Sequence, residues 1–198
     1  MTVPDRAQAA GLLLSLDPPD WAVRHARAVA EVAAWLAERV RRQGMAVDRR
    51  LVDVAALLHD VDKILPPTDP VKDEGHGAGS AAWLARVGHP ELGPIVRDHP
   101  VTRLAEPGAL EGLLRARVEA RIVAYADKRA GQRLTSVDER FAHWNRRYPR
   151  SSIDGTELRA RVDALEADVC RLAGVRPADV GRLRWTGPAF RTARTAIR

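Results

Sequence analysis

Hydrophobic residues recur at helical spacing along most of the chain, and no segment shows the alternating or β-branched runs that are typical of strands. The first strong helical pattern begins after Asp17-Pro18-Pro19-Asp20 and ends at Gln43-Gly44. A second helix is predicted from about 48 to 61, before Pro66-Pro67. Later patterns predict helices at about 80–87, 91–98, 110–130, 136–147 and 155–172. The hydrophobic pattern therefore predicts an all-α fold, a compact single-domain helical bundle.

The length and composition favour one domain. A chain of 198 residues with 45% hydrophobic content can bury a core without disulfides or a structural metal. No repeat or low-complexity linker divides it. We expect an N-terminal extension over 1–17, the main helical domain over 18–150, and a C-terminal helix and basic tail over 151–198 that packs on the same domain. A loop at 148–152 joins the last two predicted helices.

The charge and the cysteine content narrow the class of protein only slightly. The formal charge of +6 permits a nucleic acid, a membrane surface or an acidic small molecule as partner, but 29 Arg against 3 Lys is also what a GC-rich coding sequence produces. The single cysteine, Cys170, excludes an intramolecular disulfide and lies on an apolar helix face. No apolar run approaches the ~20 residues of a membrane span. We expect a cytoplasmic protein with no membrane contact and a solvated basic tail, whose arginines are Arg184, Arg191, Arg194 and Arg198.

Histidine and aspartate residues at the ends or on the apolar faces of separate predicted helices form the main candidate site. His59-Asp60 follows the apolar segment 55–58, where a buried imidazole and carboxylate without partners would cost several kcal/mol. Alone, His25 is explained as a hydrogen-bonded core residue and Asp127 as a helix cap or ion-pair partner. Together with the remaining histidines of this kind they make a set of six: His25, His59, Asp60, His76, His99 and Asp127.

This mixture of imidazoles and carboxylates suits Fe, Mn, Mg or Zn, and the absence of cysteine ligands argues against a structural zinc site. His25, His59, Asp60 and Asp127 can hold one ion and leave positions open for water and a phosphate oxygen. His76 and His99 supply enough ligands for a second ion, with Asp60 as the bridge. Two ions ~3.5 to 4 Å apart can activate water and stabilise a leaving oxygen.

The ordered set His25, His59-Asp60 and Asp127 resembles the HD superfamily of metal-dependent phosphohydrolases, which are all-helical. The resemblance spans from His25 to about 148. The motif His59-Asp60-x-x-Lys63, the later histidines and Ala126-Asp127-Lys128 are similar to the branch that binds two metals and includes symmetrical diadenosine tetraphosphate hydrolases. The resemblance implies His25, His59, Asp60 and Asp127 on one ion, and Asp60, His76 and His99 on the other.

Two residues depart from that branch. Its members usually carry a small or apolar residue where this chain has Asp62, and a threonine where it has Pro100. The segments 125–134, 138–141 and 147–149 resemble uncharacterised HD-domain phosphohydrolases more than the dinucleotide enzymes. These departures leave the metal site intact and the substrate open.

Residues beside the ligands are expected to contact the substrate or to orient the metal-bound groups. We expect catalytic roles for Asp60, Asp62 and Lys63. Lys63 lies one helical turn beyond His59 and can reach a phosphate. Asp62 either orients or deprotonates the water or, in the interpretation we prefer, anchors His59 or Lys63. The predicted phosphate contacts are Lys63, Arg103, Lys128, Arg129 and Arg133.

The sequence thus predicts a metal-dependent hydrolase of a small phosphomonoester or phosphoanhydride, with a nucleotide as the favoured substrate. The alternative is a non-catalytic HD-fold module that binds a nucleotide or RNA; nucleic acid is the less favoured partner. A regulatory or structural helical protein whose histidines are only core residues is a third hypothesis. A complete set of six ligands favours the enzyme, because a module without chemistry does not need all of them.

Overall fold

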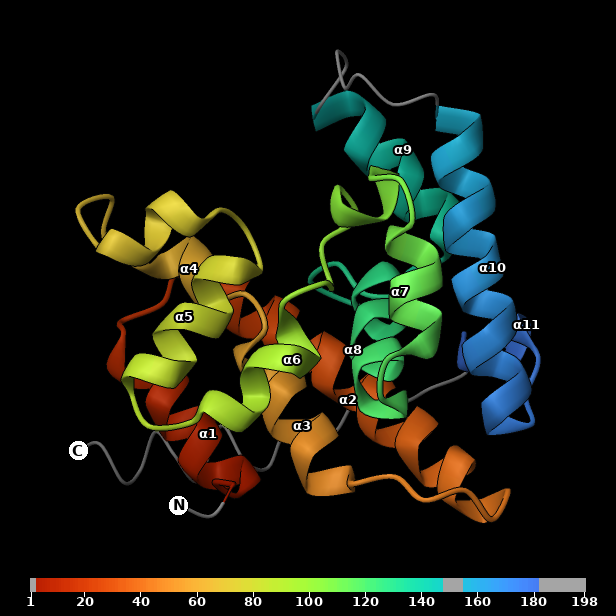
Figure 1. The fold of residues 1–198 in the computed structure, drawn as a ribbon, viewed down its shortest axis with the longest axis horizontal. Coiled ribbons are helices and arrows are strands. Elements are labelled where there is room, and N and C mark those ends of the chain that lie inside the picture. Colours follow the sequence, from red (N-terminus) through yellow and green to blue (C-terminus); the bar gives the residue numbers. More distant parts are fainter. Residues whose placement is uncertain (1–2, 148–154, 182–198) are drawn as a thin grey trace.

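The computed structural model describes residues 3–147 and 155–181, and all regular secondary structure in these ranges is helical. The prediction of an all-α fold is confirmed. The 148–152 loop and the basic tail, with Arg184, Arg191, Arg194 and Arg198, lie outside the described residues. None of the described helices is both long enough and apolar enough to cross a membrane. The helices, shown in Figure 1, are α1 (Arg6–Ser15), α2 (Asp20–Arg42), α3 (Arg49–Leu58), α4 (Val61–Ile64), η1 (Pro70–Glu74), α5 (Ala78–Arg86), η2 (Pro90–Leu92), α6 (Gly93–Val96), η3 (Arg103–Ala105), α7 (Ala109–Arg115), α8 (Val118–Lys128), α9 (Val137–Arg147), α10 (Gly155–Ala173) and α11 (Pro177–Val180).

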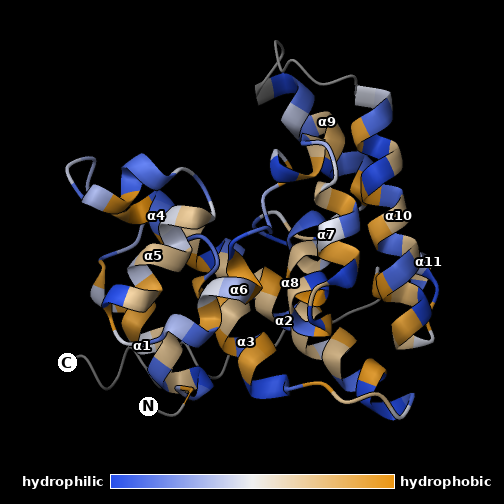
Figure 2. Cartoon of the chain, in the orientation of Figure 1, coloured by the Kyte–Doolittle hydropathy of each residue, from blue (hydrophilic) through white to orange (hydrophobic). Residues whose placement is uncertain are grey.

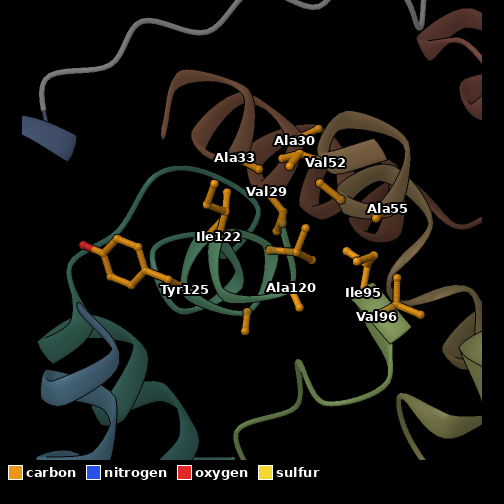
Figure 3. Packing of buried hydrophobic residues seen from close by; sticks show 14 of the residues in the cluster. Val29, Ala30, Ala33, Val52, Ala55, Ile95, Val96, Ala120, Ile122 and Tyr125 are labelled. Carbon is orange, nitrogen blue, oxygen red and sulfur yellow. The ribbon is translucent and has the colours of Figure 1, made fainter. Parts of the chain in front are cut away.

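The core lies where α2, α3 and α8 pack against one another. Val29 of α2, Val52 of α3 and Ile122 of α8 are fully buried, and Figure 3 shows them side by side with small alanines between the helices. Alanine at these positions lets the helix backbones approach closely, and the branched side chains fill the remaining space. This packing fixes the relative positions of the three helices that carry, or end next to, four of the six predicted ligands.

The remaining helices surround this core. Helices α5 and α6 pack on one side, and α10 packs against α2 and α8 on the other, as Figure 1 shows. Hydrophobic and hydrophilic residues alternate along α2 and α10 in Figure 2, as expected for amphipathic helices with one buried face. Cys170 is buried in α10, in agreement with its predicted position on an apolar face.

Two predicted helices are interrupted. The helix predicted over 48–61 stops at Leu58, because Asp60 leaves helical geometry (φ −108°, ψ 16°), and α4 begins at Val61. The helix predicted over 110–130 is divided by extended backbone at Ala116 and Arg117 into α7 and α8. Neither break has a glycine or proline at that point, so hydrophobic spacing alone could not mark it.

Helix α1 lies within the segment that we expected to be an N-terminal extension. Asp5 begins it with a capping box that includes Gln8. Arg6 then bonds to Glu31 of α2 and Asp53 of α3, which fixes the helix against the core. The segment from Val3 onward is therefore part of the packed structure, with Leu13 buried.

Candidate metal centre

Six histidine and aspartate side chains from distant parts of the chain converge in one region. They are His25 in α2, His59 and Asp60 at the break between α3 and α4, His76 just before α5, His99 just after α6, and Asp127 near the end of α8. Their ligand atoms include two groups within 4.8 Å of one another, one formed by His25, His59 and Asp60 and the other by Asp60, His76 and His99. Asp60 belongs to both groups, and its role as a bridge between two ions stays a prediction.

The deeper half of the site is centred on Nε2 of His25. This atom lies 3.2 Å from Nε2 of His59. It also lies 3.3 Å from Oδ2 of Asp60 and 3.3 Å from Oδ1 of Asp127. His59 has no exposed surface, and the His25 and Asp127 side chains are less than a tenth exposed. The first predicted ligand group therefore lies at the base of the site.

The outer half is centred on Oδ1 of Asp60. Nε2 of His99 lies 3.2 Å from this oxygen, and Nε2 of His76 lies 3.4 Å from it. The His76 side chain is 32% exposed, whereas that of His99 is 1% exposed. The site therefore opens to solvent on the side of His76.

Each of the four histidines is held through its Nδ1 atom, so that Nε2 faces the carboxylates. The Nδ1–H of His25 donates to the Gly131 carbonyl, that of His59 to the Ala56 carbonyl, that of His99 to the Val96 carbonyl, and that of His76 to Oδ2 of Asp62. A histidine whose Nδ1–H is bound in this way presents the lone pair of Nε2 to a metal. The local backbone and Asp62 thus select the ring orientation that coordination requires.

Burial and charge set the protonation of these groups. Burial lowers the pKa of His25, but hydrogen bonds to Asp127 and Asp60 outweigh this effect and raise the pKa to about 9. Burial lowers the pKa of His59 to about 3. Burial favours a higher pKa for both aspartates, but Lys63 and hydrogen bonds from His25 and His99 hold the pKa of Asp60 well below its usual range, and Lys128 does the same for Asp127. Both carboxylates are therefore charged.

The donor set fits a divalent cation. Every close neighbour of the His25 Nε2–H is an electron-pair donor: the neutral His59 ring and the charged Asp60 and Asp127 carboxylates. A cation that replaces this proton finds the same donors around it. Imidazole nitrogen and carboxylate oxygen are ligands for Mn, Fe, Mg and Zn ions.

Asp62 anchors the loop that carries His76. Its Oδ2 accepts from Nδ1 of His76 at 2.9 Å and from the backbone N–H of Gly77 at 3.1 Å, and its Oδ1 accepts from the Ser80 hydroxyl at 2.9 Å. The preferred interpretation of Asp62 as an anchoring residue therefore agrees with these contacts, although the anchored residue is His76. Pro100 packs on Gly77, so the two departures from the two-metal branch both lie against the His76 loop.

The family model of the HD domain matches residues 22–131, which is more than half of the chain and spans all six predicted ligands. The chain belongs to the HD domain family. HD domain proteins are generally metal-dependent phosphohydrolases, and the match agrees with the all-α fold and the histidine and aspartate centre. No curated protein and no solved structure matched the chain.

Two of the predicted phosphate contacts are wrong, because the structure buries both side chains in this HD domain protein. Lys128 is completely buried, and its ammonium donates to Oδ2 of Asp127 at 2.8 Å and to the His99 carbonyl. Arg129 is 5% exposed, and its guanidinium binds Tyr125, Thr135, Glu166 and Pro177. Their donors are used to position Asp127 and to join α8 to α10 and α11, so neither contacts a substrate.

The other predicted contacts lie at or near the surface. Lys63 is 41% exposed, and its ammonium lies 2.8 Å from Oδ2 of Asp60. Arg103 pairs with Glu106 and Asp98, and Arg133 is exposed on the loop after α8. A role in phosphate binding remains a prediction for Lys63, Arg103 and Arg133, and Lys63 is the one in contact with a predicted ligand.

Sequence reasoning missed Arg140. Its Nη2 lies 3.3 Å from Oδ1 of Asp127, although α9 follows the ligand helix across a loop. The chain contains many arginines, and the sequence around Arg140 does not distinguish it from the exposed arginines of the same helix.

Proposed function

We propose that this HD domain protein hydrolyses a small phosphomonoester or phosphoanhydride, with a nucleotide as the substrate class. The observation that carries the proposal is the convergence of four Nδ1-anchored histidines on two charged aspartates. This arrangement makes the Nε2 lone pairs and the carboxylate oxygens available together at one place. A helical protein with ordinary core histidines has no reason to orient four of them in this way.

We assign His25, His59, Asp60 and Asp127 to one cation, and Asp60, His76 and His99 to a second. The position of the Asp60 carboxylate supports this assignment, because Oδ2 faces His25 and Oδ1 faces His59 as well as His76 and His99, so that both groups meet at this one side chain. When bound, Fe, Mn, Mg or Zn ions supply a water of lowered pKa and the Lewis acidity that phosphoryl transfer needs. Because this assignment uses two ions, it also supports placing the chain in the branch of the HD superfamily that binds two metals.

The residues around the centre have separate tasks in this proposal. Lys63 is partly exposed beside Asp60, so its ammonium is available to a phosphate at the open side. Asp62 keeps His76 in place and thereby shapes the outer half. The substrate enters on the side of His76, and the small exposure of the other ligands favours a small molecule over a nucleic acid duplex.

The test uses protein purified without a histidine tag. Bound metal is measured by mass spectrometry, and phosphate release is then measured for a panel of nucleotides and simple phosphate esters with Mn²⁺, Fe²⁺ or Mg²⁺. We expect metal binding and turnover of at least one compound. Asp60→Ala is expected to abolish turnover, because it removes a ligand from both groups, and the exposed Asp73→Ala is the matched control.

Other results would contradict the proposal. Full turnover by Asp60→Ala would remove the basis of the assignment. Bound metal without turnover of any compound would favour the alternative, an HD-fold module that binds a nucleotide or RNA. Failure to bind any of the ions would favour a helical protein whose histidines have only structural roles.

A further inference from the structure

Arg140 reaches the candidate metal centre from α9, outside the region matched by the family model. Its side chain is 13% exposed, and the guanidinium carbon lies 4.9 Å from the centre of the Trp144 ring. Its Nη2 contacts Asp127, whereas its Nε is buried and has no hydrogen-bond partner among the described residues. Burying a guanidinium N–H without a hydrogen-bond acceptor costs free energy, unless a further acceptor, such as a ligand, binds there.

Asp127 has a second basic partner besides Arg140. Lys128 is completely buried and already donates to Oδ2 of Asp127 at 2.8 Å. Arg140 contacts the other oxygen, Oδ1, which also faces Nε2 of His25 at 3.3 Å. A cation held by His25 and Asp127 would compete with Arg140 for this same oxygen.

The position of Arg140 is fixed by α9 rather than by Asp127 alone. Phe141 packs against Trp144 with ring centres 5.2 Å apart, and Arg159 of α10 stacks on Phe141 and pairs with Asp138. The guanidinium is therefore held beside the deeper ligand group even when Asp127 has another partner. The Arg140 guanidinium and a metal cation in the deeper ligand group would then be neighbouring positive charges. In a site of low exposure such charges repel each other strongly unless an anion lies between them.

We propose that Arg140 binds a phosphate oxygen of the substrate, with its Nε–H and an Nη–H as donors, when Asp127 holds a cation. An arginine edge matches two oxygens of a phosphate, and the Trp144 ring holds the guanidinium face without using these donors. This inference rests on the proposed function and adds a specificity residue to it. The expected ligand class is a phosphate with at least two unesterified oxygens.

The test measures binding of inorganic phosphate to the Mn²⁺-loaded protein by calorimetry. We expect Arg140→Gln to weaken phosphate binding about 10- to 100-fold, as for loss of a charged hydrogen bond, and to raise KM for the hydrolysed compound. Arg140→Lys should restore part of the affinity. Arg146→Gln, an exposed arginine of the same helix, is the matched control and should bind phosphate as the wild-type protein does.

Mn²⁺ affinity and the far-UV circular dichroism are measured for each variant. An Arg140→Gln protein that is folded, binds Mn²⁺ normally and binds phosphate within twofold of wild type would overturn this inference alone. Weaker Mn²⁺ binding with unchanged phosphate binding would also overturn it, because Arg140 would then act only through Asp127. A wild-type protein that binds no metal would overturn the proposed function, and the inference with it.

Discussion

At the scale of single residues, the centre depends on side chains that contact the predicted ligands as much as on the ligands themselves. Lys128 and Asp62 follow ligands in the sequence, yet both use their polar atoms within the protein. Burial lowers the pKa of Lys128, and the neighbouring Asp127 carboxylate opposes this shift. Their contacts decide where Asp127 and His76 lie, and so they belong to the site without contacting a substrate.

Asp62→Ala is expected to weaken the binding of a second cation about 10- to 100-fold, because His76 loses the acceptor of its Nδ1–H. Calorimetric titration with Mn²⁺ gives the affinity and the number of ions. Asp73→Ala controls for the loss of one negative charge, because Asp73 is an exposed residue of η1, between α4 and α5. Unchanged affinity and stoichiometry in Asp62→Ala would mean that His76 does not depend on Asp62.

At the scale of helices, the positions of the predicted ligands depend on where a helix is interrupted and on where two segments of the chain pack closely. The break after Leu58 turns His59 and Asp60 toward the same centre, which a continuous helix would not do for adjacent residues. Gly77 begins α5 with φ +83°, and a Cβ there would lie 2.8 Å from Pro100. The glycine therefore lets the segments that carry His76 and His99 pack directly against each other.

Gly77→Ala is expected to lower the free energy of unfolding by about 2–4 kcal/mol, from the positive φ and the overpacking against Pro100. Urea unfolding followed by circular dichroism measures this change. Gly112→Ala is the matched control, since Gly112 lies in α7 with open space around it and the substitution should stabilise the helix by about 0.5–1 kcal/mol. Equal stabilities of the two variants would contradict the close approach at Gly77.

At the scale of the whole molecule, the centre joins α2, the α3–α4 break, the segments that flank α5 and α6, and α8. Unfolding separates these ligands, because they are far apart along the chain. A metal that binds the folded protein much more tightly than the unfolded chain must therefore stabilise the whole fold.

Mn²⁺ at about 100 times its Kd is expected to add about 2.7 kcal/mol to the free energy of unfolding. For a chain of this length the melting temperature should then rise by about 5–10 °C. Differential scanning calorimetry with and without a chelator measures the shift, and Asp60→Asn should reduce it strongly. The same melting temperature at every Mn²⁺ concentration would show that the six side chains do not bind the ion in the folded protein.

The sequence by itself determined the helical class, most helix positions and the ordered set of six histidine and aspartate residues. These features depend on local periodicity, capping residues and side-chain chemistry, which a single chain displays directly. Tertiary structure alone decided where the helices break without glycine or proline, that Arg129 pairs with Glu166, and that Arg140 reaches Asp127. Such pairings depend on which helix faces meet, and in a chain with 29 arginines no local pattern separates the buried guanidinium groups from the exposed ones.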